Sequence, residues 1–315
     1  MKSIAKEKMN ILVLGAGAMG SLFGGYLSKN NNVVLVDVAT PVVEAINANG
    51  LVINEPDGSS NIYKVKAATA ATLASDFTAD LVVVFVKAMY SKSALDSIKG
   101  AIGPETFIMS VQNGSGHEEL LSQYVDENHV LIGTTQHNCA VLGMGNVKHG
   151  GSGLTHVGRV NGDVTGLDVL AENFTACNLV TDCKTNLKQL VWEKLFTNIS
   201  ASALTGVFKA PLGFIAENAN AWAICTELVK EAVDVAKADG CDFDFETELA
   251  KVKKVCTNSP AGITSICADL RNGRKSEVDT ISGSVVRKAA KLGVAAPYHA
   301  MVVDVIHGLE AIGNN

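Results

Sequence analysis

A glycine-rich segment near the N-terminus carries the most specific chemical signal in the chain. The segment, GAGAMG at 15–20, lies between a short apolar run and a stretch with helical spacing. In such a turn the first glycine allows a tight bend, the second admits a pyrophosphate, and the third lets helix and strand pack closely. The pattern predicts a dinucleotide site, with a tight turn alone as the alternative. The expected cofactor-binding residues are Gly15, Ala16, Gly17, Ala18, Met19 and Gly20.

An acidic residue follows at the spacing expected of a ribose ligand. Asp37 lies at the end of the second β-branched run, and neither Arg nor Lys occurs in 38–47. A carboxylate at this position accepts hydrogen bonds from the adenosine ribose hydroxyls and repels a 2′-phosphate. Asp37 therefore favours NAD over NADP, while an Asp that closes a turn is the alternative.

Two more polar residues end apolar runs. Lys87 follows LVVVFV at 81–86, and Asn113 follows the next run and precedes Gly114. Ligands of open α/β sheets bind at the carboxyl ends of the strands, so both side chains are candidates for contact with the cofactor or the substrate. A lysine that leaves a strand into solvent and a simple Asn-Gly turn are the alternatives.

A lysine, an amide and a hydroxyl recur every four residues in the second half of the chain. Lys194, Asn198 and Ser202 would share one face of a helix over 186–207. A lysine in a partly desolvated cleft can have its pKa lowered enough to donate a proton near neutral pH. An exposed lysine with ordinary neighbours is the alternative.

Carboxylates at Glu277 and Asp279 are expected at the start of a helix over 276–292, where a capping role is the plain interpretation. The histidines show no HxH or HExxH spacing, and no GxSxG segment occurs. Neither a metal site nor a serine nucleophile is therefore predicted.

The elements that must position these residues change in kind near residue 185. Strand-like and helix-like segments alternate up to that point, and helical segments alone follow it, at 186–207, 218–238, 245–256 and 276–292. The alternation predicts an α/β fold, a Rossmann-type doubly wound sheet followed by an all-helical C-terminal domain. We expect a dinucleotide-binding domain over 1–185 and a helical substrate and catalytic domain over 186–315.

Composition excludes several other classes of protein. The 315 residues include 26 Lys and Arg against 32 Asp and Glu, which argues against nucleic acid as a partner. No apolar run reaches the ~18 residues of a membrane span, and residues 1–9 do not resemble a secretory signal. Seven cysteines without a CxxC pair indicate reduced thiols. We expect a cytoplasmic protein, a homodimer, with no membrane partner.

With these residues, the chain resembles the ketopantoate reductases (2-dehydropantoate 2-reductases). This family includes the NAD-dependent D-2-hydroxy-acid dehydrogenases of D-mandelate type, which share its fold. The resemblance covers nearly the whole chain. It rests on GAGAMG (15–20), VKA (86–88), QNG (112–114), GTT (133–135), GLTHVG (153–158), KLFTN (194–198), LT (204–205), Ser265, Asp269, SEVD (276–279) and GVAAP (293–297).

The resemblance implies a role for each candidate residue. Lys194 matches the general acid that protonates the substrate carbonyl oxygen, and Glu277 matches a carboxylate near that lysine and the nicotinamide ribose. Lys87 matches a lysine that contacts the cofactor. The residues that match the substrate site are Asn113, Asn198, Ser202 and Ser265, and Asn113 also matches a contact to the nicotinamide.

Three positions depart from the family pattern. NADPH-dependent members carry a basic residue where this chain has Asp37, and asparagines are common where it has Ser202 and Ser282. These changes lead us to expect NADH-dependent reduction of 2-oxo acids with branched or aromatic side chains to D-2-hydroxy acids. Reduction of ketopantoate to D-pantoate is the alternative. A dinucleotide-sensing protein without activity is a remote one, because Lys194 and Glu277 are both present.

Overall fold

The computed structural model describes residue 4 and residues 8–313, which form two compact units. The sheet unit runs to Gln112 and resumes over His117–Leu187, and the helical unit comprises Asn113–Gly116 and the residues from Lys188 on. This division lies beside the expected boundary between 185 and 186, and it adds the segment 113–116 to the helical unit.

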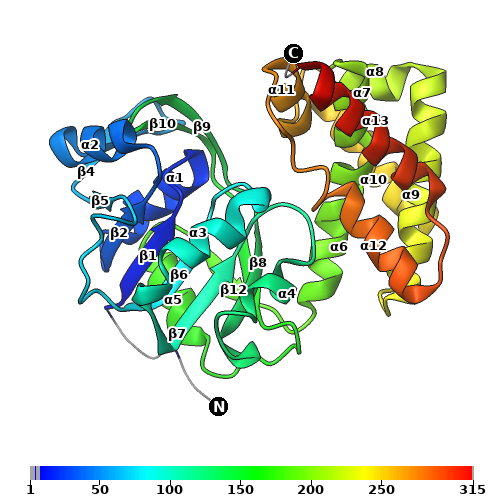
Figure 1. The fold of residues 1–315 in the computed structure, drawn as a ribbon. Coiled ribbons are helices and arrows are strands. Elements are labelled where there is room, and N and C mark those ends of the chain that lie inside the picture. Colours follow the sequence, from blue (N-terminus) through cyan, green and yellow to red (C-terminus); the bar gives the residue numbers. More distant parts are fainter. Residues whose placement is uncertain (1–3, 5–7, 314–315) are drawn as a thin grey trace. The chain divides into compact units, whose positions relative to one another are not determined.

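The sheet unit is built on eight strands in the order β12-β11-β8-β7-β6-β1-β2-β5 (Figure 1). All neighbours pair in parallel except β11, which runs antiparallel to β8. Continuous apolar runs at the centre, such as β1 and β6, are buried, as expected of strands covered on both faces. The strands are β1 (Asn10–Leu14), β2 (Asn32–Val36), β5 (Lys66–Ala68), β6 (Ala79–Val84), β7 (Ile102–Ser110), β8 (Val130–Thr135), β11 (Thr155–Gly158) and β12 (Thr181–Cys183).

The helices of this unit connect the strands, which confirms the predicted α/β class. They are α1 (Ala18–Leu27), α2 (Thr40–Asn49), α3 (Ser91–Ser97), α4 (His117–Leu121) and α5 (Asp168–Ala176), with 3₁₀ turns at 88–90, 99–101 and 127–129.

A second, four-stranded sheet has the order β4-β3-β10-β9. A hairpin turns around Pro56-Asp57-Gly58, because β3 (Leu51–Asn54) pairs antiparallel with β4 (Ser60–Tyr63). The chain then leaves this sheet, and residues 66–68 pair with β2 in the main sheet. The Asn47 side chain holds both backbone groups of Ala67, which fixes this switch between sheets. The other two strands are β9 (Asn138–Gly143) and β10 (Asn146–Gly151).

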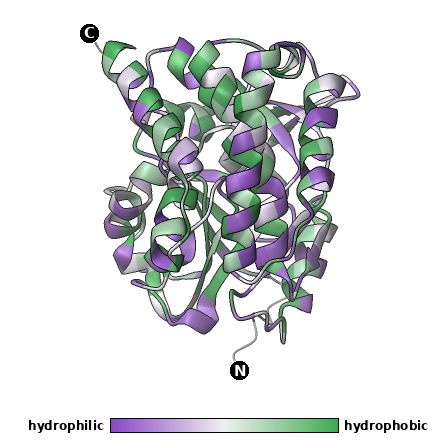
Figure 2. Cartoon of the chain, turned by 90° about the vertical axis from the view of Figure 1, so that its right-hand side faces the viewer, coloured by the Kyte–Doolittle hydropathy of each residue, from purple (hydrophilic) through white to green (hydrophobic). Residues whose placement is uncertain are grey.

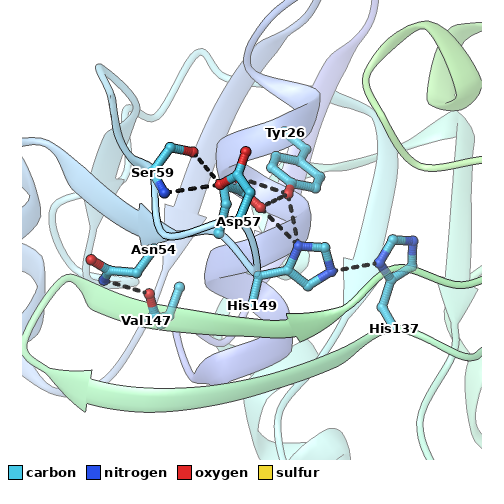
Figure 3. Close-up of polar contacts among 8 residues, drawn as sticks. Tyr26, Asn54, Asp57, Ser59, His137, Val147 and His149 are labelled. Carbon is cyan, nitrogen blue, oxygen red and sulfur yellow. Dashed lines mark hydrogen bonds and ion pairs between the residues drawn. The ribbon is translucent and has the colours of Figure 1, made fainter.

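A polar cluster joins this second sheet to α1 (Figure 3). The Tyr26 hydroxyl lies 2.8 Å from both carboxylate oxygens of Glu55 and 3.0 Å from His149 Nδ1. His149 Nε2 in turn lies 3.2 Å from His137 Nδ1. Since α1 begins at the glycine loop, the cluster connects the far end of that helix to strand β10 and to Glu55, the residue after β3.

The helical unit consists of amphipathic helices around an apolar core, and Figure 2 shows hydrophilic and hydrophobic residues on the same helices. Side-chain caps start α9, α10 and α11, because the side chains of Asn218, Asp244 and Thr264 accept hydrogen bonds from backbone N–H groups in the first turn. The helices are α6 (Leu187–Thr197), α7 (Ala203–Phe208), α8 (Leu212–Glu217), α9 (Ala219–Ala238), α10 (Phe245–Asn258), α11 (Ser265–Arg271), α12 (Ser282–Leu292) and α13 (Pro297–Gly313).

The predicted start of the helix over 276–292 is wrong, because α12 begins at Ser282. The preceding residues form a turn in which the Glu277 carbonyl accepts the N–H groups of Thr280 and Ile281. The Ser276 N–H donates to Glu310 on α13, a partner that is distant in sequence.

Over residues 4 and 8–313, no helix is long and apolar enough to cross a membrane. No group of three or more His, Cys, Asp or Glu side chains in the same part of the chain is arranged to hold a metal ion.

Candidate active site

The glycine loop occupies the turn between β1 and α1. A Cβ on Gly15, whose φ is +102°, would lie 2.9 Å from the Val86 nitrogen, and one on Gly20 would lie 1.9 Å from the Gly15 oxygen. The fold itself therefore requires glycine at these two positions. At Gly17, by contrast, a Cβ would meet nothing within 4 Å. The empty space beside this exposed glycine, at the N-terminus of α1, fits a pyrophosphate that must approach the backbone closely.

Asp37 lies directly after β2 and faces this loop. Its Oδ2 accepts a hydrogen bond of 2.7 Å from the Ala16 N–H, and its Oδ1 accepts one of 2.9 Å from the Ala39 N–H. A carboxylate offers about four acceptor positions, so both oxygens can still accept from ribose hydroxyls.

A cavity of about 300 Å³ adjoins Asp37 and is mainly apolar, as an adenine ring would require. None of the described residues around it is basic, so none could neutralise a 2′-phosphate. They are Leu14, Val36, Asp37, Val38, Ala70, Val86, Tyr90, Ser93, Ala94 and Ser97.

Lys87 follows β6 on the same edge of the sheet and is partly buried. Its backbone carbonyl accepts from the Tyr90 N–H and so closes the 3₁₀ turn at 88–90. Gln112, two residues after β7, donates to Ser91 Oγ over 2.9 Å and also to the Val86 carbonyl. These bonds fix the two loops that follow β6 and β7.

Burial strongly perturbs the Lys194 ammonium in the helical unit. It lies in the last turn of α6 and is partly buried. Desolvation lowers its pKa from 10.5 to about 8, and the negative charge of Glu277 opposes that shift. The structure thus brings Lys194 and Glu277 into electrostatic contact, although 83 residues separate them in the chain. An ammonium with this pKa can release a proton near neutral pH.

The helix that carries Lys194 does not continue as an α-helix. Residues Asn198–Ser202 form a π-helical turn between α6 and α7. Hydrogen bonds in a π-turn span five residues instead of four, so the regular helix expected over 186–207 is interrupted at these positions. Single π-turns within helices frequently occur at functional sites. Asn198 is partly exposed there, and Ser202 is buried.

Asn113 belongs to the helical unit, although it lies only three residues after β7 of the sheet unit. The Ser115 N–H donates to the Thr280 carbonyl over 3.0 Å. Gly114 has a φ of +98°, and a Cβ there would lie 2.2 Å from the same oxygen. The segment with Asn113 is therefore bound to the turn that carries Glu277, and glycine is required for that approach.

Ser265 is the exposed first residue of α11, and two threonines that sequence reasoning left without a role connect it to the π-turn. Thr264 Oγ1 lies 2.7 Å from Thr205 Oγ1, and Thr205 donates to the Ser202 carbonyl over 2.7 Å. Thr264 also caps α11, a pattern that its place before a short apolar segment could have revealed. Nearby in the chain, the Ser282 hydroxyl is fully buried and has no hydrogen-bond partner among the described residues.

Both units resemble known proteins. Residues 11–162 match the family model described as ketopantoate reductase PanE/ApbA, and residues 186–310 match the model of its C-terminal region. A 2-dehydropantoate 2-reductase of Streptococcus pyogenes is 30% identical over 310 residues, which cover 97% of this chain and 99% of that protein. One of Halobacterium salinarum is 29% identical over 95% of this chain and 98% of its own length.

Solved structures show the same similarity. The ternary structure of D-mandelate dehydrogenase with NADH and anilino(oxo)acetate has a TM-score of 0.89 at 27% identity, covering 97% of this chain and 99% of that one. A PanE/ApbA family ketopantoate reductase from Ralstonia eutropha has a TM-score of 0.87 at 26% identity, covering 98% of this chain and all of that one. The protein is therefore an oxidoreductase that acts on CH–OH groups with a nicotinamide cofactor, and it belongs to the ketopantoate reductase family.

Proposed function

We propose that this enzyme reduces a 2-oxo acid to its 2-hydroxy acid, with Lys194 as the proton donor. The observation that carries the proposal is the partly buried Lys194 ammonium, which has a pKa of about 8 and interacts with Glu277. A bound nicotinamide cofactor would supply the hydride to the carbonyl carbon. Lys194 Nζ would then give its proton to the carbonyl oxygen, and its positive charge would stabilise the developing alkoxide.

In this proposal the remaining candidate residues bind the cofactor and the substrate and orient them. Residues 15–20, Asp37 and Lys87 would hold the cofactor. Glu277 would keep Lys194 protonated at neutral pH and lie near the nicotinamide ribose. The amides and hydroxyls of the helical unit would hold the substrate, at Asn113, Asn198, Ser202 and Ser265.

Ketopantoate is the better supported substrate, which reverses the order expected from the sequence. The curated relatives from Streptococcus pyogenes and Halobacterium salinarum are named 2-dehydropantoate 2-reductase. The structural similarity to D-mandelate dehydrogenase favours the second candidate, a 2-oxo acid with a branched or aromatic side chain.

We further propose that NADH is preferred over NADPH. Asp37 and the absence of a basic residue around the adjoining cavity, among the residues described, support this preference. We also propose that the protein is cytoplasmic and forms a homodimer.

Steady-state rates test these assignments together. Ketopantoate, phenylglyoxylate and 2-ketoisocaproate should each be assayed with NADH and with NADPH. The expected result is a highest kcat/KM for ketopantoate with NADH. A highest value for phenylglyoxylate would select the second substrate class, and no turnover of any pair would refute the proposal.

A further inference from the structure

Two side chains of α13 hold the turn that carries Glu277. Glu310 Oε1 accepts hydrogen bonds of 2.7 Å from both the N–H and the hydroxyl of Ser276. His307 lies between two carboxylates, with Nδ1 3.0 Å from Glu310 Oε2 and Nε2 3.1 Å from Asp279 Oδ1. The residues at 276 and 279, on either side of Glu277, are therefore bound to one helix.

Burial and charge make these bonds strong. Glu310 is 8% exposed and Ser276 is 3% exposed. Burial by itself would raise the pKa of Glu310, but the hydrogen bonds from Ser276 and His307 outweigh it and lower that pKa below its ordinary value. The carboxylate is thus ionised at neutral pH, and hydrogen bonds to an ionised acceptor are shorter and stronger than neutral ones.

The same contacts shift the pKa of His307 in the opposite direction, above its ordinary value. Its hydrogen bond to Glu310 raises its pKa, burial opposes the shift, and Asp279 adds to it. A protonated His307 can donate from both ring nitrogens at once, to Glu310 and to Asp279. Arg287 Nη1 also donates to the Asp279 carbonyl over 2.8 Å, from α12.

We propose that Glu310 and His307 are positioning residues that fix the Glu277 carboxylate relative to the Lys194 ammonium. The inference rests on the proposed function for the role of Lys194. Glu277 raises the pKa of Lys194 against the larger effect of desolvation. A turn released from α13 would let Glu277 move, and the ammonium would lose part of its electrostatic support.

Direct titration of Lys194 tests this inference without turnover. The ¹³Cε resonance of Lys194, assigned by its loss in Lys194→Met, is followed against pH in the substrate-free protein. We expect a midpoint near pH 8 in the wild type. Glu310→Gln should lower it by about 0.5–1 pH unit, and His307→Ala should lower it by less. Asp304→Asn, an exposed carboxylate on the same helix, is the matched control and should leave the midpoint unchanged.

The pH dependence of turnover gives a second readout. With the lower midpoint, Glu310→Gln should reduce kcat for reduction by about three- to eightfold at pH 8.5 and by less than about 1.5-fold at pH 6.5. A merely structural loss would reduce kcat equally at both values of pH.

An unchanged or raised Lys194 midpoint in the folded variants would overturn the inference. If circular dichroism shows that Glu310→Gln does not fold, His307→Ala decides alone, because that side chain is 43% exposed. A lowered midpoint in a protein that reduces no 2-oxo acid would refute the proposed function and leave the positioning role supported.

Discussion

Replacement of Lys194 by Met removes the proton donor while it keeps an unbranched side chain of similar length. In the wild type a pKa of about 8 leaves roughly nine-tenths of Lys194 protonated at pH 7 and roughly one-tenth at pH 9. The rate of reduction should therefore fall about tenfold per pH unit above pH 8. Lys194→Met should reduce kcat about a hundredfold or more and abolish this pH dependence.

The same substitution should not destabilise the fold. The pKa of Lys194 is lower in the folded protein than its ordinary value of 10.5, so the folded state binds this proton less tightly than the unfolded state. The resulting loss of stability is present in full below pH 8 and disappears as the pH rises to 10.5. From a shift of that size, Lys194→Met should raise the free energy of unfolding at pH 7 by up to about 3 kcal/mol.

The assay combines kcat for reduction between pH 6 and pH 10 with urea unfolding at pH 7. Lys188→Met is the control, because Lys188 lies on the same helix with its side chain 50% exposed. It should leave kcat and its pH dependence unchanged. A kcat for Lys194→Met within about threefold of the wild type, or a wild-type kcat that is flat from pH 7 to pH 10, would refute the assignment.

Three further predictions address the cofactor site and stability. Gly17→Ala should fold normally, because a Cβ there meets no protein atom, but it should raise the KM for NADH about tenfold or more. Gly20→Ala should unfold at a markedly lower urea concentration, because a Cβ there meets the Gly15 oxygen. Asp37→Asn should lower the ratio of kcat/KM for NADH to that for NADPH about tenfold, and an unchanged ratio would remove Asp37 from cofactor selection. Burial lowers the pKa of His299 from 6.5 to about 4, so the unfolded state binds this proton more tightly. The free energy of unfolding should therefore fall by up to about 3 kcal/mol between pH 6.5 and pH 4, and His299→Gln should flatten that decline in urea titrations.

The sequence predicted what local spacing determines. The glycine loop and the buried strands β1 and β6 follow from short patterns, because a tight turn and a covered strand each constrain neighbouring residues directly. The α/β class and the family followed from the order of such patterns and are confirmed.

Features that depend on tertiary contacts were missed. A single regular helix was expected over 186–207, and the π-turn at Asn198–Ser202 interrupts it. The bond from Ser276 to Glu310 spans 34 residues and holds a turn where a helix start was expected. Neither Glu310 nor Thr264 has a spacing to Lys194 that a local pattern could detect. The assigned roles of the individual site residues stay predictions until the variants are measured.

The placement of Asn113–Gly116 in the helical unit bears on how such enzymes can be divided or recombined. The chain leaves the sheet unit after Gln112, returns at His117 and leaves again after Leu187, so the helical unit is not a contiguous module. A fragment expressed from Lys188 onward would lack Ser115, and the Thr280 carbonyl would lose that hydrogen bond beside Glu277. A chimera that exchanges the C-terminal half between two relatives would likewise pair one parent's loop with the other's turn. A steric match between Gly114 and the residue at 280 is therefore a condition that any such exchange must meet.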